Sequence, residues 1–167
     1  MHTDPVDAAR FYLEGLASLH LRRRVEPQAV AAVLESSPPI EYAAGQQIFR
    51  QGEASDSALL VVHGELSVYV SSPDGDRIVG TVGPWDVVGE TALYAPDEPR
   101  SASVRASRDS TCLLITREML AAGRRNGVVA ALEYHLLHTM SHRLRVTNHG
   151  IHDAWRELDT GLLRETP

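Results

Sequence analysis

The stretch from residue 88 to residue 104, V-G-E-T-A-L-Y-A-P-D-E-P-R-S-A-S-V, most constrains what this chain can fold into. It combines a Gly-Glu pair, a short apolar segment, a loop with two prolines, and an Arg-Ser-Ala run that leads into an alternating strand. Few structures other than a tight turn built around a ligand need this combination within so short a distance. The pattern therefore predicts an anion-binding loop.

The chemistry of this loop follows from its residue types. Gly89 has no Cβ, so the backbone can approach a ligand closely there. Residues 91–94 have helical character, and the free N–H groups at a helix start commonly receive a phosphate. Arg100 offers a planar fork of donors that suits two phosphate oxygens, and Ser101 adds a hydroxyl and its own N–H.

Glu90 adds a second requirement. A carboxylate beside a phosphate is repulsive unless it accepts a hydrogen bond from a hydroxyl of the same ligand. The pairing of Glu90 with Arg100 thus indicates a sugar next to a phosphate, which is a small nucleotide.

Residues 88–104 resemble the phosphate-binding cassette of the cyclic nucleotide-binding domain family. The resemblance implies that Glu90 accepts from the ribose 2′-hydroxyl and that Arg100 and Ser101 bind the cyclic phosphate of cyclic AMP or cyclic GMP. The expected ligand-binding residues of the cassette are Gly89, Glu90, Thr91, Ala92, Arg100, Ser101 and Ala102. The sequence departs from the family pattern at Val88, where an aromatic residue is usual, and at Trp85, where glycine is common.

The segment from residue 40 to residue 116 predicts the fold. It contains short runs of alternating or β-branched residues, separated by turn signals at intervals of about ten residues. The runs cover residues 46–50, 58–63, 66–71, 77–82, 101–106 and 111–116. Such spacing is typical of an antiparallel β-roll or jelly roll, a double-stranded β-helix. Residues 45–53 and 61–68 also resemble the opening strands of the same family.

Helices are expected on both sides of this roll. An amphipathic pattern covers residues 5–24, and a short helix is expected at residues 27–34, with Pro27 in its first turn. A long helix is expected from the N-cap Asn126 to about residue 159. The chain is therefore expected to be mainly β with flanking helices. Residues 1–125 would form the N-terminal helices and roll, and residues 126–167 a long dimerisation helix of the same domain.

The long helix carries a coiled-coil pattern. At 1.5 Å per residue it would be roughly 50 Å long, more than a small roll can cover. Its apolar stripe alternates steps of three and four through Leu137, Met140, Leu144, Thr147, Ile151, Ala154 and Leu158. This spacing predicts a symmetric homodimer along the helix.

Thr147 is a polar residue in that stripe, and two interpretations are open. It can set the register of the dimer without binding anything. Alternatively, residues 140–148 resemble the helix of catabolite activator proteins in the same family, which implies that Thr147 contacts the nucleotide base and that Asn148 reaches it across the dimer. This resemblance favours cyclic AMP as the ligand, with cyclic GMP as the alternative.

Composition excludes several other classes of function. Cys112 is the only cysteine, so an intrachain disulfide or a Cys-x-x-Cys site is impossible. All 16 basic residues are arginines, which excludes lysine-dependent Schiff-base and P-loop chemistry. The net charge of −6 argues against a broad nucleic-acid surface. A membrane span or a secretory signal is not expected, so the predicted location is the cytoplasm.

The expected function is that of a cyclic nucleotide sensor that is not an enzyme and passes a conformational change of its C-terminal helix to a protein effector. A DNA-binding domain is not expected, since only about eight residues follow residue 159. A cupin-like metal enzyme is one alternative, although the roll offers only His63. His135, His138 and His142 have the spacing of metal ligands, but without a nearby cysteine or carboxylate no metal or catalytic residue is expected. A domain of the same fold that binds another ligand, or none, is a further alternative.

Overall fold

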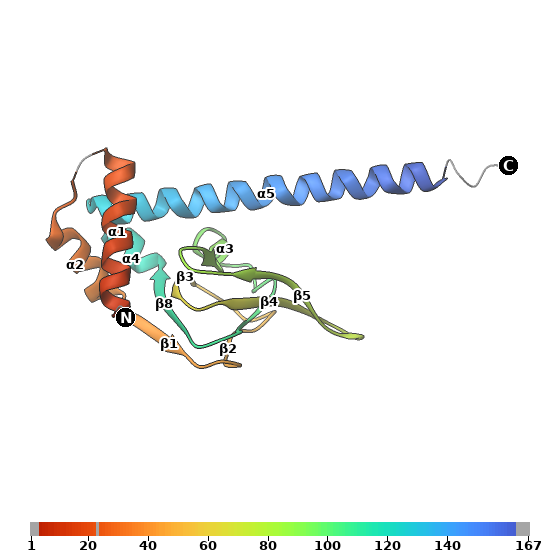
Figure 1. Ribbon diagram of the computed structural model, residues 1–167, viewed down its shortest axis with the longest axis horizontal. Coiled ribbons are helices and arrows are strands. Elements are labelled where there is room, and N and C mark those ends of the chain that lie inside the picture. Colours follow the sequence, from red (N-terminus) through yellow and green to blue (C-terminus); the bar gives the residue numbers. More distant parts are fainter. Residues whose placement is uncertain (1–3, 23, 163–167) are drawn as a thin grey trace.

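Eight strands form two antiparallel sheets in this protein, and helices flank them (Figure 1). The computed structural model describes the backbone of residues 4–22 and 24–162 and the side chains of residues 4–22 and 24–156. The first sheet has the order β1 (Pro39–Tyr42), β8 (Ser110–Thr116), β3 (Ser57–His63) and β6 (Val87–Val88). The second has the order β2 (Gln47–Phe49), β7 (Ser103–Ala106), β4 (Leu66–Ser72) and β5 (Gly75–Val82). The predicted β-roll with flanking helices is confirmed.

Strand β3 belongs to two hydrophobic cores at once. Its side chains alternate between the two faces of the sheet. Leu59 and Val61 point into the roll, whereas Ala58, Leu60 and Val62 pack against the helices. Because both faces of β3 are covered, the strand is almost entirely apolar. It therefore connects the helical layer to the roll.

The helices gather at one end of the roll, beside the first sheet (Figure 1). They are α1 (Pro5–Leu21), α2 (Pro27–Ser36), α4 (Arg117–Ala122) and the beginning of α5 (Gly127–Leu162). Helix α3 (Thr91–Tyr94) lies apart from them, directly after β6. Leu13, Val30, Leu132 and Leu136 are fully or almost fully buried in the core that these helices share with β3.

The long helix α5 begins as the sequence predicts. The Asn126 side-chain oxygen accepts from the N–H of Val128 at 2.9 Å, and its amide nitrogen donates to the carbonyl of Ala29 at 2.8 Å. Asn126 therefore caps α5 and also ties it to α2. From residue 144 to residue 156 every side chain is exposed, and Figure 1 shows that α5 crosses over the roll and continues past it. None of the described residues covers this half of the helix.

The observed elements differ from the predicted ones in places where the local signal is weak. Strands β1 and β6 and helix α4 were not predicted, because segments of two to six residues show too little periodicity. Strand β7 begins at Ser103 and not at residue 101, since Ser101 and Ala102 belong to the preceding loop.

The first helix also differs from its prediction. It ends at Leu21 and not at residue 24, because Arg22 has a left-handed backbone with φ of 54°. Phe11 and Leu19, two apolar residues of this segment, are both 80% exposed and do not belong to its buried face. The buried face consists of Ala9, Leu13 and Ala17. Small residues allow α1 to approach its neighbours closely.

None of the helices in the described part of the chain is both long enough and apolar enough to cross a membrane.

We predict that Gly64→Ala destabilises the protein far more than Gly45→Ala. Both glycines have a left-handed φ, which costs an alanine about 1 kcal/mol. A Cβ at Gly64 would also lie 2.2 Å from Ser110 Oγ and 2.5 Å from the Asp109 carbonyl oxygen, while a Cβ at Gly45 meets nothing within 4 Å. Urea unfolding should show a loss of about 3 kcal/mol for Gly64→Ala and about 1 kcal/mol for Gly45→Ala. Equal losses would contradict the packing described at Gly64.

Candidate functional site

A cavity of about 300 Å³ lies between the second sheet, the loop around Gly89 and helix α5. One wall is apolar and is formed by Phe49, Val68, Val79, Val82, Val88 and Val104. The charged residues that line the cavity are Asp86, Glu90, Arg100 and Arg143. Its size falls within the usual range for small-molecule sites, and an apolar wall facing a few charged groups is also typical of them.

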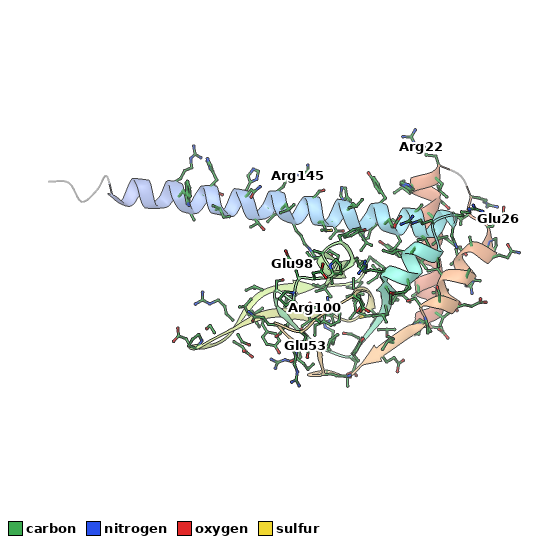
Figure 2. The ribbon with its side chains drawn as sticks, turned by 180° about the vertical axis from the view of Figure 1, so that it is seen from behind. Arg22, Glu26, Glu53, Glu98, Arg100 and Arg145 are labelled. Atoms are coloured by element: carbon green, nitrogen blue, oxygen red, sulfur yellow. The ribbon has the colours of Figure 1, made fainter. Side chains whose placement is uncertain are left out.

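Arg100 is the buried cation of the site. It is 9% exposed and lies within the roll, beneath α5 (Figure 2). Its Nη2 donates to the carbonyl of Ser57 at 2.7 Å and its Nη1 to the carbonyl of Gly89 at 3.2 Å. The guanidinium stacks on the Phe49 ring, 3.6 Å from the ring centre. A guanidinium has five N–H donors, so Arg100 can still donate to an anion in the cavity.

Burial disfavours the charged form of Arg100. Burial lowers the pKa of its guanidinium, and the carboxylates of Asp56, Glu53 and Glu90 act in the opposite direction. Because the pKa of an arginine lies far above neutral pH, Arg100 stays charged there. The site therefore presents a permanent, partly desolvated positive charge, which favours an anionic ligand.

Gly89 makes room for Arg100. Its φ is 79°, and a Cβ built on it would lie 2.3 Å from Arg100 Nη1 and 3.0 Å from the Phe49 ring. The sequence interpretation attributed this glycine to the approach of a ligand. The structure gives a different reason, since the space beside Gly89 is filled by the arginine and the aromatic ring on which that arginine stacks.

Glu90 is paired with a residue that the sequence analysis did not identify. Its side chain is 8% exposed, and its Oε1 accepts from Arg143 Nη1 at 2.7 Å. Arg143 Nη2 also donates to Asp86 Oδ1 at 3.1 Å and to the carbonyl of Val87. Arg143 lies in α5, so the long helix supplies one charged wall of the cavity. Glu90 has a second oxygen that can accept from a ligand hydroxyl.

A signal for Arg143 is present in the sequence. Leu132 and Leu136 are the last two buried residues of α5, and Arg143 follows Leu136 by seven residues, so all three lie on one face of the helix. A continuation of the buried face would have placed Arg143 over the roll. The same pattern could not have identified its partners Glu90 and Asp86, which depend on how the helix is placed.

The remaining predicted cassette residues lie close together. Thr91, Ser101 and Ala102 line the cavity with Gly89, Glu90 and Arg100. The helix expected at residues 91–94 is confirmed as α3. Ala92 is buried behind the cavity wall, and its N–H donates to the Gly89 carbonyl at 3.2 Å and is not aimed at the cavity.

Thr147 and Asn148 lie outside the residues that line the cavity. Both are exposed on α5, and Thr147 is one helical turn beyond Arg143. Their contact with a base stays a prediction.

The other candidate groups of the sequence analysis lie away from this cavity. Cys112 is buried inside the roll, and burial raises the pKa of its thiol to about 12. Within the described residues, no group of three or more His, Cys, Asp or Glu side chains is arranged to hold a metal ion.

The curated relatives of this chain include two regulatory proteins. One is the CRP-like cAMP-activated global transcriptional regulator of Mycobacterium tuberculosis, 27% identical over 141 residues that cover 84% of this chain and 62% of the relative. The other is the cAMP-dependent protein kinase regulatory subunit of Dictyostelium discoideum, 26% identical over 113 residues that cover 65% of this chain and 34% of the relative. The chain thus spans less than two thirds of the length of either protein.

Solved structures and a family profile agree with these similarities. The catabolite activator protein of Thermus thermophilus has a TM-score of 0.63 and 30% identity, over 75% of this chain and 58% of that chain. A cyclic nucleotide-binding domain from Methylobacillus flagellatus has the same fold, with a TM-score of 0.70 and 20% identity over 92% of this chain and 97% of that one. Residues 39–124, just over half of the chain, match the profile of the cyclic nucleotide-binding domain. The chain therefore belongs to the cyclic nucleotide-binding domain family.

Proposed function

We propose that this protein is a cyclic nucleotide sensor that binds cyclic AMP in preference to cyclic GMP. One observation carries the proposal: a buried arginine, Arg100, and a buried carboxylate, Glu90, face one cavity whose remaining charged wall, Arg143, comes from the long helix α5. A ligand in this cavity would contact the loop and the helix together. Membership in the family supports the ligand class.

The charges in the cavity suit a nucleotide with a single negative charge. Glu90 and Asp86 are both paired with Arg143, which leaves Arg100 as the cation available to a cyclic phosphate. Ser101 lies beside Arg100 and adds a hydroxyl. Glu90 would accept from the ribose 2′-hydroxyl, and the valines of the second sheet would cover the apolar side of the sugar.

The preference for cyclic AMP rests on the α5 residues that follow Arg143. Thr147 and Asn148 would meet the base, with Asn148 reaching it from the partner of a dimer. The two relatives described above are named as a cAMP-activated regulator and a cAMP-dependent kinase regulatory subunit, which supports the same choice.

The proposed output is a change in α5 and not a chemical reaction. Ligand that contacts Arg143 and Thr147 would favour one placement of the helix over others, by no more than its differential affinity for them. The exposed half of α5 would pass this change to a partner copy and, through the dimer, to a protein effector.

The exposed apolar residues of α5 also support a homodimer. Leu137, Leu144 and Ile151 are all more than half exposed, and they lie on the seam that the heptad spacing predicts. Leu158, the last residue of that seam, lies outside the described side chains. We propose that residues 126–167 form the dimerisation helix of the same domain as residues 1–125.

Arg100→Ala should weaken the binding of cyclic AMP by about ten- to a hundredfold, because a charge-assisted contact to the phosphate is lost. Titration calorimetry measures the change. Arg100→Lys keeps the charge without the planar fork, so its affinity for cyclic AMP should lie between those of the parent and of Arg100→Ala. Arg108→Ala, an exposed arginine paired with Glu65 outside the cavity, is the matched control and should bind like the parent. Parent-like binding by Arg100→Ala would exclude the proposed site.

Thr147→Val should reduce the affinity for cyclic AMP by roughly three- to tenfold, the cost of one hydrogen bond to the base, while the seam keeps its shape. Thr139→Val makes the same change on the same helix away from the seam and should have no effect. Titrations of the parent and both variants with cyclic AMP and cyclic GMP test this. Tighter binding of cyclic GMP by the parent would contradict the proposed specificity.

Leu144→Asn should raise the dissociation constant of the dimer by about tenfold or more, because it places an amide in an apolar seam in both copies. Val146→Asn is the control, since Val146 is similarly exposed, at 58% against 64% for Leu144, but lies on a different face of the helix. Analytical ultracentrifugation over a concentration series distinguishes them. If Val146→Asn weakens the dimer as much as Leu144→Asn, the proposed seam is wrong.

A further inference from the structure

Trp85 has an unusual backbone for its residue type. Its φ is 70°, and among the described residues only Arg22 shares a positive φ without being glycine. The left-handed region is disfavoured for a bulky side chain, and such residues persist where surrounding contacts hold them. Contacts with neighbouring residues therefore keep the indole at this corner.

Helix α1 holds the indole ring. The Tyr12 ring stacks on Trp85, with ring centres 4.3 Å apart and planes 10° from parallel. Burial raises the pKa of Tyr12 to about 12, with the negative charge of Asp86 acting in the same direction, so its hydroxyl is protonated at neutral pH. The residue that packs on the corner before the cassette thus comes from the N-terminal helix.

Helix α5 holds the backbone of the same corner. His135 Nε2 lies 3.1 Å from the Trp85 carbonyl oxygen and 3.3 Å from the Tyr12 hydroxyl. A carbonyl only accepts, so Nε2 carries the proton and donates to it. The Trp85 N–H donates to the Val61 carbonyl at 2.7 Å, which joins the corner to β3. We call Tyr12, Trp85 and His135 the corner cluster.

The corner cluster is continuous with the candidate nucleotide site. Asp86, the next residue, accepts from Arg143, which lies two turns after His135 on α5. The chain then passes through β6 to Gly89 and Glu90, where Arg143 makes its second ion pair. Residues 85–90 are therefore held by two residues of α5, His135 and Arg143, and by Tyr12 of α1.

We propose that Tyr12, Trp85 and His135 are positioning residues for nucleotide binding. They fix the corner at residues 85–86 against α1 and α5, and so hold Arg143 and Glu90 in the geometry that the ligand meets. The docking of α1 then contributes to nucleotide affinity although α1 does not line the cavity. This role rests on the proposed function. Its effect on the backbone dynamics of residues 85–90 can also be measured without ligand.

The experiment compares Tyr12→Ala and Tyr12→Phe with the parent, and uses Phe11→Ala as the matched control because Phe11 is the adjacent aromatic of α1 and is exposed. Titration calorimetry with cyclic AMP should show about a fivefold or greater loss of affinity for Tyr12→Ala, the lower end of typical coupling between sites. Tyr12→Phe keeps the stacked ring and should lose less than Tyr12→Ala. Phe11→Ala should match the parent.

Amide hydrogen exchange on the unliganded proteins supplies the readout that is independent of ligand. Exchange in residues 85–90 should be faster in Tyr12→Ala and His135→Ala than in the parent and in Phe11→Ala. His135→Ala is the second variant should Tyr12→Ala fail to fold. Unchanged exchange in residues 85–90 would overturn the positioning role, whereas a parent that binds no cyclic nucleotide but shows the predicted exchange would refute only the proposed function.

A double-mutant cycle tests the route of the effect. If Tyr12 acts through Arg143, the losses of cyclic AMP affinity in Tyr12→Ala and Arg143→Ala should not add in the double variant, because contacting networks are non-additive. Additive losses would show that α1 affects binding without passing through Arg143, and would overturn the proposed route.

Discussion

The contact of Arg143 with Glu90 and Asp86 is the interaction on which the rest of this structure depends. It is the point where the long helix meets the loop that carries the candidate site. Glu90 is buried, and a buried carboxylate that loses its cation is strongly destabilising. The loop and α5 are therefore coupled electrostatically, and a ligand that competes for Glu90 must act on the helix as well.

The packing of the helices determines which part of α5 this contact can affect. Leu132 and Leu136 fix the first half of α5 against the core shared with β3, while the side chains from residue 144 to residue 156 are exposed in the part of the chain that the structure describes. Local stability in a protein follows the number of buried contacts, so it should fall along α5 from the core toward its exposed end. Arg143 lies at the boundary between the two halves, where a small change at the site can alter the exposed half most.

Features that depend only on residues close together in the sequence could be predicted from it. The strand spacing gave the roll, Asn126 marked the start of the long helix, and the segment from Gly89 to Ala102 identified the family and six residues that do line one cavity. Each of these signals comes from a few residues in a row, because turn chemistry, strand periodicity and helix capping act over that range. Strands β1 and β6 are too short for such a signal and exist only through pairing with distant strands.

Tertiary structure alone decided which residues of α5 meet the loop. The sequence marked Thr147 by its position in the heptad seam but could not identify the partners of Arg143, which lies 53 residues from Glu90 and joins it directly. Likewise, Gly89 looked like room for a ligand and proved to be room for Arg100 and Phe49. In both cases the deciding quantity is the rotation and placement of one element against another. That placement is set by the burial of side chains such as Leu132 and Leu136 against residues far away in the chain, which no local pattern can encode.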